Sequence, residues 1–320
     1  MKKNISVIGC GHWGKNLVRN FSDLGVLSSI CDPNTEIANK YANQYNANNY
    51  SFTQILDDSN IEGVVIAVPA YLHASMAIEA MNAGKNVFIE KPIAMNVSEA
   101  ELMIATAKKN EVQLMVGHLL QYHPIFKTIR KIVDTGEIGK LNYIYSNRLS
   151  LGKVRSKEDV IWSFAPHDIS MILSLAGQEP ESVSTNSTSI LQKNIADTAT
   201  INLEFKSGLK SHISVSWLHP YKEHKLVVIG KFAMLVFDDI KPWNKKLALY
   251  KYETVPSHGK INLESSDVEY VNVIEEEPLK NECQHFINVV KKNTQPLTDG
   301  AEGLKVIKVL TAASQSQTIK

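Results

Sequence analysis

The chain has 320 residues, of which 44% are hydrophobic and 21% charged, as in a globular protein long enough for two domains. Its 34 Lys and Arg against 33 Asp and Glu give a net charge of +1, so charge offers no case for binding nucleic acid or an anionic membrane. The three cysteines are widely spaced, no apolar run is long enough to span a membrane, and no metal-ligand cluster stands out. We therefore expect a cytoplasmic protein without disulfides, metal or a membrane anchor.

The first 120 residues alternate short apolar runs with amphipathic stretches. Apolar runs predict strands at 5–9, 26–31, 63–68, 86–90 and 112–117, and helices are expected between them at 16–24, 35–45, 73–83 and 98–109. The last helix opens on Ser98-Glu99-Ala100-Glu101, a capping-box pattern. Strands that are apolar on both faces and alternate with helices predict a doubly wound parallel sheet covered on both sides.

The pattern changes from about residue 139 to period-two alternation of polar and apolar residues. Strands are expected at 140–151, 181–191, 197–205, 209–217 and 224–230, and the turn Lys206-Ser207-Gly208 joins two of them as a hairpin. Helices return at 277–292 and 302–317. The fold class is therefore α/β, with a first domain over 1–120. The second domain, over 121–320, is an α/β domain with an open, mostly antiparallel sheet.

A glycine-rich turn, "VIGCGHWGKN", follows the first strand and precedes the first helix. Gly9, Gly11 and Gly14 have the spacing G-x-G-x-x-G, in which the first glycine allows a tight turn and the second lets the backbone approach a pyrophosphate. The third lets helix and strand pack closely. Free amides near His12 and Trp13 are expected to face the phosphates. The turn predicts a Rossmann dinucleotide-binding domain.

An aspartate ends the second strand. Asp32 lies in "SICDPN", 18 residues after Gly14, where an acid can bind both hydroxyls of a ribose. A carboxylate there repels a 2′-phosphate, so the sequence predicts NAD rather than NADP. The alternative is an ordinary glycine turn with a surface aspartate.

The ends of the fourth and fifth strands carry further candidates for the same crevice. The fourth ends in Val68-Pro69, and His73 follows at the start of the next helix. The fifth ends in "NVFIEKPIAMN", with Glu90 and Lys91. Desolvation at this sheet edge disfavours the charged form of Lys91, so that it can exchange a proton near neutral pH. The alternative is a lysine that only pairs with Glu90 or extends to water.

The glycine turn, the acid after the second strand and Glu-Lys-Pro after the fifth together resemble the Gfo/Idh/MocA oxidoreductase family, over essentially the whole chain. These are two-domain sugar and cyclitol dehydrogenases. The resemblance implies that Lys91 lies beside the nicotinamide and the reacting hydroxyl. It also implies that the cofactor site includes Pro69, His73, Glu90 and Gln121. A homodimer or homotetramer, formed through the open sheet, is implied as well.

In this family a helix of the second domain points at the substrate, often with an aspartate four residues before a histidine. "IWSFAPHDIS" supplies the histidine as His167, but Ser163 stands in the place of the acid. Serine can hydrogen-bond an imidazole and brings no charge. We therefore expect Lys91 to be the principal base and His167 to assist it. One interpretation of Asp168 is that it stabilises the N-terminus of this helix.

The stretches 147–173, 216–239 and 299–310 resemble bacterial members that oxidise UDP-linked N-acetyl sugars at C3, in surface-polysaccharide or lipid A sugar biosynthesis. The implied substrate is a small molecule, a nucleotide sugar. Arg148, Arg155 and Lys222 are then candidates for the diphosphate, or form ordinary surface ion pairs. Trp162 stacks on a sugar or uracil ring, or fills the domain interface. Three alternatives stay open: a dehydrogenase of free sugars or inositols, an NAD-dependent glycoside hydrolase, and a non-catalytic regulator that senses dinucleotide or sugar.

Overall fold

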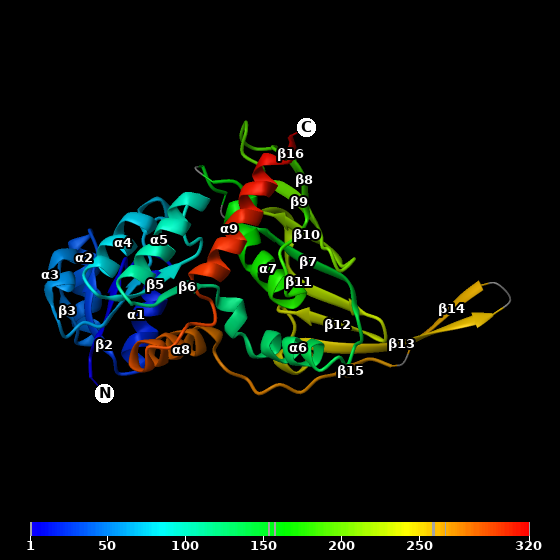
Figure 1. Cartoon of the computed structure of the whole chain (residues 1–320), viewed down its shortest axis with the longest axis horizontal. Coiled ribbons are helices and arrows are strands. Elements are labelled where there is room, and N and C mark those ends of the chain that lie inside the picture. The colour runs from blue at the N-terminus through cyan, green and yellow to red at the C-terminus, as the bar shows by residue number, and fades with distance from the viewer. Residues whose placement is uncertain (1, 153, 157, 258–259, 266, 320) are drawn as a thin grey trace. The chain divides into compact units, whose positions relative to one another are not determined.

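The computed structural model describes residues 2–152, 154–156, 158–257, 260–265 and 267–319, and the chain divides into two compact units (Figure 1). The first unit comprises residues 1–122 and 277–307, and the second comprises 123–276 and 308–320. The sequence-based division puts all of 121–320 in one domain. In the structure, residues 277–307 instead belong to the first unit.

The first unit is built on a parallel sheet. Among the described residues, six strands follow the order β3-β2-β1-β4-β5-β6. Their bounds are β1 Ile5–Ile8, β2 Leu27–Cys31, β3 Asn48–Asn49, β4 Gly63–Ile66, β5 Asn86–Glu90 and β6 Leu114–Gly117. The strand order reverses between β1 and β4, and a doubly wound sheet binds its ligand at the carboxyl ends of the strands beside such a reversal.

Helices cover both faces of this sheet. They are α1 Gly14–Asp23, α2 Thr35–Tyr45, α3 Phe52–Asp57, α4 His73–Asn82, α5 Val97–Lys109 and α8 Pro278–Lys292, with short 3₁₀ turns η1 Ala70–Leu72 and η2 Leu119–Tyr122. α9, Gly300–Gln315, begins in this unit and ends in the second. The predicted cap at Ser98 is wrong. Asn96 caps α5, because its side chain accepts the backbone N–H of Glu99 at 2.9 Å.

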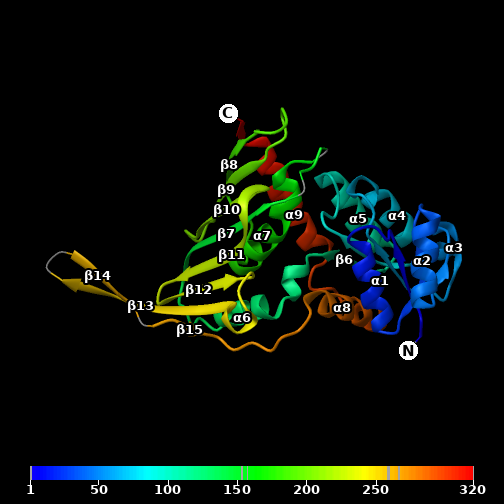
Figure 2. The ribbon, with the colours of Figure 1, turned by 180° about the vertical axis from the view of Figure 1, so that it is seen from behind.

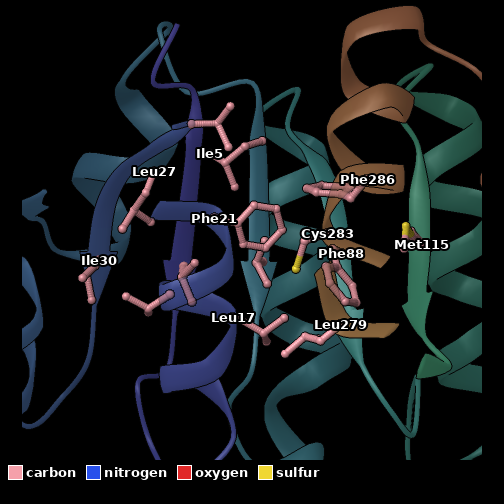
Figure 3. Close-up of a cluster of buried hydrophobic side chains, with 14 of the residues drawn as sticks. Ile5, Leu17, Phe21, Leu27, Ile30, Phe88, Met115, Leu279, Cys283 and Phe286 are labelled. Atoms are coloured by element: carbon pink, nitrogen blue, oxygen red, sulfur yellow. The ribbon is translucent and has the colours of Figure 1, made fainter. Parts of the chain in front are cut away.

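The late helix α8 joins the first unit through a buried aromatic cluster (Figure 3). The ring of Phe286 lies 6.3 Å from Phe21 of α1, edge to face, and 5.7 Å from Phe88 of β5. Gly63 of β4 lets the helix approach, since a Cβ there would lie 3.1 Å from the Phe286 ring. Full burial of such rings stabilises a domain by several kcal/mol, about 3–5 for each phenylalanine judged by truncation to alanine. The apolar face of α8 thus has its partner in a sheet whose last strand ends at Gly117, 161 residues before the helix begins at Pro278.

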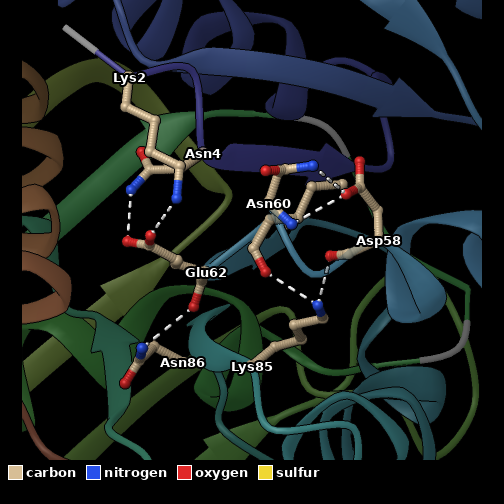
Figure 4. A network of polar contacts seen from close by, with 8 residues as sticks. Lys2, Asn4, Asp58, Asn60, Glu62, Lys85 and Asn86 are labelled. Atoms are coloured by element: carbon tan, nitrogen blue, oxygen red, sulfur yellow. Dashed lines mark hydrogen bonds and ion pairs between the residues drawn. The ribbon is translucent and has the colours of Figure 1, made fainter.

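A polar network ties the loops at the amino ends of the strands (Figure 4). Glu62 accepts hydrogen bonds from Lys2 Nζ at 2.6 Å and Asn4 Nδ2 at 2.8 Å. The Lys85 ammonium donates to the carbonyl of Asp58 at 2.7 Å. These contacts lie at the edge opposite the carboxyl ends of the strands and leave that edge for a ligand.

The second unit is built on a mostly antiparallel sheet. Over the described part of the chain its ten strands follow the order β14-β13-β12-β11-β7-β10-β9-β8-β16, with β15 paired to β13. β7 pairs with β10, and β8 with β16, in parallel; the other pairs are antiparallel. Bounds are β7 Leu141–Leu151, β8 Ser182–Thr188, β9 Thr198–Glu204, β10 Lys210–Ser216, β11 Leu218–Gly230, β12 Ala233–Asp238, β13 Leu247–Ser257, β14 Lys260–Ser265, β15 Glu269–Tyr270 and β16 Gln317–Ile319. The predicted hairpin between β9 and β10 is confirmed, with Gly208 at φ +84°.

Helices α6 Pro124–Asp134 and α7 Val160–Ala176 pack on one face of this second sheet (Figures 1 and 2). A 3₁₀ turn, η3 Trp243–Lys245, follows β12. Alternate residues of the central strands, such as Ile144 and Ser146 of β7, are buried on the face that carries the helices. Within the described residues, no helix has both the length and the apolar character that crossing a bilayer requires.

Candidate active site

The glycine-rich turn joins β1 to α1 at the carboxyl edge of the first sheet. Gly9 has φ +89°, and a Cβ there would lie 2.6 Å from the carbonyl oxygen of Ala67. At Gly14 a Cβ would lie 1.9 Å from the carbonyl oxygen of Gly9, so helix and turn meet in direct contact. At Gly11 a Cβ would meet no described atom within 4 Å, and His12 beside it is exposed. The turn has a close-packed floor and an open side, as the approach of a pyrophosphate requires.

A hollow of about 670 Å³ lies beside this turn, and its lining includes Gly9, Gly11, Asp32, Val68 and Pro69. The carboxylate of Asp32 is fixed by two backbone amides: Oδ2 accepts from Cys10 N at 2.6 Å and Oδ1 from Asn34 N at 2.8 Å. An acid held at the end of β2, next to open space, is where a ribose hydroxyl is bound in this class of sheet. The open turn, the fixed acid and the hollow therefore fit the adenosine and pyrophosphate parts of NAD.

Glu90 ends β5 at the same sheet edge, and Lys91 follows it. Glu90 is only 7% exposed, and its Oε1 accepts a hydrogen bond from Trp13 Nε1 at 2.5 Å, which ties the glycine turn to β5. Burial raises the pKa of Glu90, while the Trp13 hydrogen bond and the charge of Lys91 oppose the rise. Lys91 is half-buried, and its backbone N–H donates to Glu90 Oε2 at 3.2 Å. The Trp13 side chain thus holds the acid that precedes the candidate base.

His73, the first residue of α4, bridges the loops after β4 and β5. Its Nδ1 lies 2.7 Å from the carbonyl oxygen of Pro92 and its Nε2 2.9 Å from that of Val68. Burial lowers the pKa of His73, and the two backbone hydrogen bonds oppose this. A neutral imidazole donates only one N–H, so it satisfies one carbonyl at a time. His73 therefore holds the loop that carries Lys91 against the end of β4.

A second buried imidazole stands at the end of β6 and was not singled out by the sequence reasoning. His118 is 1% exposed, and its Nδ1 lies 2.5 Å from Glu302 Oε2 in the first turn of α9. Gln121, a predicted cofactor contact, is buried three residues later in η2, where its backbone N–H donates to the His118 carbonyl at 2.9 Å. The position of His118 directly after a buried strand could have identified it as a candidate from the sequence. The sequence could not have identified Glu302 as its partner, because the two are 184 residues apart.

Helix α7 of the second unit carries the other predicted group, His167. Asp159 caps the helix, because its Oδ1 accepts the backbone N–H of Trp162 at 3.1 Å. Ser163 is buried and His167 is half-buried, and their i, i+4 spacing in a continuous helix puts them on one side. The Trp162 indole N–H donates to Ser314 Oγ of α9 at 2.9 Å, so its ring is held on the second unit.

Asp168 does not stabilise the N-terminus of α7, and that interpretation is wrong. It lies in the middle of the helix, fully buried, and faces the second sheet. Its Oδ2 pairs with Arg148 Nε at 2.6 Å, Oδ1 accepts from Arg148 Nη2 at 3.2 Å, and Ser146 of β7 donates to Oδ1. The third nitrogen of Arg148, Nη1, lies 3.5 Å from His224 Nδ1. Asp168 and His167, about 100° apart on the helix, therefore have different partners.

The predicted site residues divide between the units. Arg155 is exposed and lies 3.5 Å from Glu158, and Lys222 is exposed on β11. The first unit gathers the predicted cofactor residues and Lys91 at one sheet edge; the second holds Arg148, Arg155, Trp162 and His167 on and around α7. In the described part of the chain, no group of three or more His, Cys, Asp or Glu side chains is placed to hold a metal ion.

Two family models match this chain, one in each of its two units. Residues 3–118 match the oxidoreductase family with an NAD-binding Rossmann fold, and residues 126–236 match the GFO/IDH/MocA C-terminal domain. The first match spans the glycine turn, Asp32 and Lys91, and the second spans α7 with His167.

Two similar proteins extend over nearly the whole chain, and one of them has a solved structure. The UDP-N-acetylglucosamine 3-dehydrogenase of Acidithiobacillus ferrooxidans is 26% identical over 306 residues, which cover 94% of this chain and 93% of that protein. The inositol 2-dehydrogenase of Rhizobium meliloti is 23% identical over 331 residues, covering 99% and 97%. A solved structure of the Acidithiobacillus enzyme has a TM-score of 0.86, with 24% identity and 98% of each chain covered. At this identity the structural match supports the fold.

Proposed function

Because this chain belongs to the Gfo/Idh/MocA family of NAD-binding oxidoreductases, we propose that it oxidises a ring hydroxyl of a sugar to the ketone. The proposed reacting position is C3 of a UDP-N-acetylhexosamine, in surface-polysaccharide or lipid A sugar biosynthesis. The observation that carries the proposal is Lys91, which follows β5 at the same sheet edge as the open glycine turn. The full-length similarity to a UDP-N-acetylglucosamine 3-dehydrogenase supports the nucleotide sugar.

In the proposed reaction Lys91 is the base. When bound, NAD supplies the acceptor for the hydride that leaves the ring carbon. Lys91, as the free amine, takes the proton of the hydroxyl, and the carboxyl of Glu90 stabilises the resulting ammonium. The hydrogen bond from Trp13 fixes Glu90 in this position. His167 assists by orienting the hydroxyl with a hydrogen bond, and Ser163 brings no charge that would hold His167 as an imidazolium.

We propose that arginines of the second unit bind the diphosphate of the substrate. Arg155 is exposed, and its ion pair with Glu158 at 3.5 Å is of the surface type that contributes little. Arg148 has two of its donors bound to Asp168, so it contributes through Nη1. Trp162, held through its indole N–H, offers an aromatic face to a sugar or uracil ring.

A second candidate is the oxidation of a free sugar or an inositol. It is favoured by the similarity to an inositol 2-dehydrogenase over 99% of this chain. The same cofactor residues and Lys91 serve both reactions. The two differ in whether the second unit binds a diphosphate.

We also propose that the chain forms a homodimer or homotetramer through the second sheet. The face opposite α6 and α7, here called the outer face, carries the half-buried side chains of Tyr143, Tyr145, His212, Ile229 and Met234. Register places these five residues on one side of four neighbouring strands. An aromatic and aliphatic surface of this kind is a typical interface between copies of a chain.

The test is mass spectrometry of nucleotide sugars and free polyols after incubation with the protein and NAD. Loss of two hydrogens from a UDP-N-acetylhexosamine, with NADH formed, is the expected result. Lys91→Ala should lower the rate at least about 100-fold, as removal of a general base does, with NAD affinity largely retained. Lys109→Ala, which changes an exposed lysine of α5, should react at the normal rate.

Other outcomes identify the alternatives. Oxidation of inositols or free sugars alone supports the second candidate. Cleavage of a glycosidic bond without net NADH indicates an NAD-dependent glycoside hydrolase. Binding of NAD without turnover of any substrate indicates a non-catalytic regulator. A Lys91→Ala protein that reduces NAD at the normal rate contradicts the proposed mechanism.

A further inference from the structure

A structural role alone explains the dyad of the buried His118 and the partly exposed Glu302 poorly. Nδ1 of His118 is 2.5 Å from the Glu302 carboxylate, and the imidazole itself is buried. The backbone N–H of Glu302 donates to Asp299 Oδ1 at 2.8 Å, which fixes the first turn of α9. Burying the imidazole costs desolvation that an apolar side chain of the same volume would avoid, so its contact with the carboxylate is weak evidence for stability.

The dyad adjoins the acid that precedes Lys91. Strand register pairs Glu90 of β5 with Gly117 of β6, the residue before His118. A Cβ at Gly117 would lie 3.1 Å from Glu90 Oε2, so the carboxyl of Glu90 occupies the space over that glycine. The charge of His118 also acts on Glu90 and lowers its pKa against the dominant effect of burial. Glu90 thus ends β5 beside the end of β6, with Lys91 and His118 as the next residues after the two paired strands.

Of Glu90, His118 and Glu302, Glu302 is the one whose side chain reaches solvent. The side chain of Glu302 is 23% exposed, whereas those of Glu90 and His118 are buried. Glu282 of α8 is a second buried carboxyl, and burial raises its pKa well above the usual range, with the charge of Glu90 adding to the rise. Burial also raises the pKa of Glu90, and a raised pKa favours uptake of a proton by its carboxyl.

We propose that Glu90, His118 and Glu302 form the path by which the proton taken by Lys91 leaves for solvent. The hydroxyl oxygen gives its proton to Lys91 while the carbon gives its hydride to NAD, so the substrate loses two electrons and two hydrogens. The ammonium passes one proton to Glu90. His118 takes it on one ring nitrogen and gives its Nδ1 proton to Glu302, which releases it to water. One proton leaves, and Lys91, Glu90 and Glu302 return to their starting forms. The His118 ring is left with its hydrogen on Nε2 and regains the Nδ1–H form by proton exchange with solvent before the next turnover. This rests on the proposed function, because it needs the proton of an oxidised hydroxyl.

The test uses two variants that keep the shape of the dyad. His118→Asn retains an N–H donor near the position of Nδ1, and Glu302→Gln retains the volume of the carboxylate; neither can pass a proton along. Each should lower kcat about 10- to 100-fold while KM and NAD affinity stay within about twofold. The ratio of kcat in H₂O to kcat in D₂O should rise. The matched control is Glu62→Gln at the opposite sheet edge, which should leave all these values unchanged.

A second measurement does not depend on turnover. In protein labelled with ¹⁵N, the His118 ring should carry its hydrogen on Nδ1, the nitrogen that lies 2.5 Å from the Glu302 carboxylate. Glu302→Gln should change that resonance. A proton found on Nε2 alone overturns the proposal.

Each remaining outcome decides between the two proposals. Normal kcat and isotope ratio in both variants, with an active wild-type protein, overturn the proton path and leave the proposed function standing. Loss of NAD affinity or of folding in both variants assigns the dyad to holding α9 and also overturns the path. A wild-type protein that oxidises no hydroxyl overturns both.

Discussion

The glycines of the first turn differ in their surroundings, so substitutions at different positions can separate an effect on folding from an effect on cofactor binding. Gly14→Ala would put a methyl group 1.9 Å from the Gly9 carbonyl oxygen, so the turn must shift. We expect it to lower the free energy of unfolding by about 1–3 kcal/mol or more and to weaken NAD binding. Gly11→Ala meets no described atom, so the free energy of unfolding should change by less than about 1 kcal/mol. NAD affinity should still fall at least about tenfold, because the methyl group fills the open side of the turn.

The measurements are urea denaturation and NAD titration of both variants. The informative contrast is a stable Gly11→Ala protein that binds NAD poorly. If Gly11→Ala bound NAD as well as the wild-type protein, the pyrophosphate would have to lie elsewhere.

Single residues were predictable where the chemistry is local to a turn or a strand end. Gly9, Asp32 and Lys91 each follow a buried strand, and parallel strands bring their carboxyl ends to one edge whatever the loops do. Long-range partners were not predictable. The pairing of Asp168 with Arg148 depends on which face of α7 meets β7, and a single histidine in the sequence does not identify Glu302 as its partner.

At the scale of elements, the start of α6 depends on an imidazole and should respond to acid. His123 caps this helix, because its Nδ1 accepts the backbone N–H of Ile125 at 3.1 Å, which requires the neutral ring. The ring also stacks on Trp243 at 5.5 Å. Burial lowers the pKa of His123 from 6.5 to about 4; the charge of Asp239 opposes this, and that of Lys246 adds to it.

This lowered pKa sets the sign of the expected effect. Between about pH 6.5 and pH 4 the unfolded chain binds a proton at His123 that the folded chain does not, so the free energy of unfolding falls as the pH falls. The loss should be at most about 3 kcal/mol. His123→Asn keeps a capping acceptor without a titration, so its free energy of unfolding should depend less steeply on pH. Urea denaturation at pH 7 and pH 4.5 measures both slopes, and equal slopes would contradict the assignment.

Elements were predicted where hydrophobic periodicity is long, and missed where it is short. β3 has two residues and α3 has six, too few for either period to show. The capping-box motif predicted Ser98 as the cap of α5, but the chain turns at Asn96 and the helix starts there. α8 was predicted as a helix but was placed in the second domain, whereas it belongs to the first unit. Its apolar face indicates that the helix packs on another element but does not identify that element.

At the scale of the whole molecule, the composition predicts a chain long enough for two domains, and the outer face of the second sheet is the surface proposed to join copies of the chain. Tyr145 stacks on His212 with an interplanar angle of 2° at 5.3 Å, and the Tyr143 hydroxyl lies 2.8 Å from His212 Nδ1. These rings form a preordered surface at the centre of the outer face, between β7 and β10. An interface there brings the same residues from two copies close to one another, because two-fold interfaces are self-complementary.

Tyr145→Glu should therefore separate the copies. In a two-fold interface it places carboxylates of like charge close together and removes one of the stacked rings, which we expect to cost several kcal/mol, on the order of a hundredfold or more in association. Light scattering after size-exclusion chromatography at micromolar concentration should give a dimer or tetramer for the wild-type protein and a monomer for this variant. Asn142→Glu, which adds the same charge to an exposed position of β7 with the opposite orientation, is the control and should leave the assembly intact. An assembly that survives Tyr145→Glu and breaks with Asn142→Glu would place the interface on the other side of the sheet.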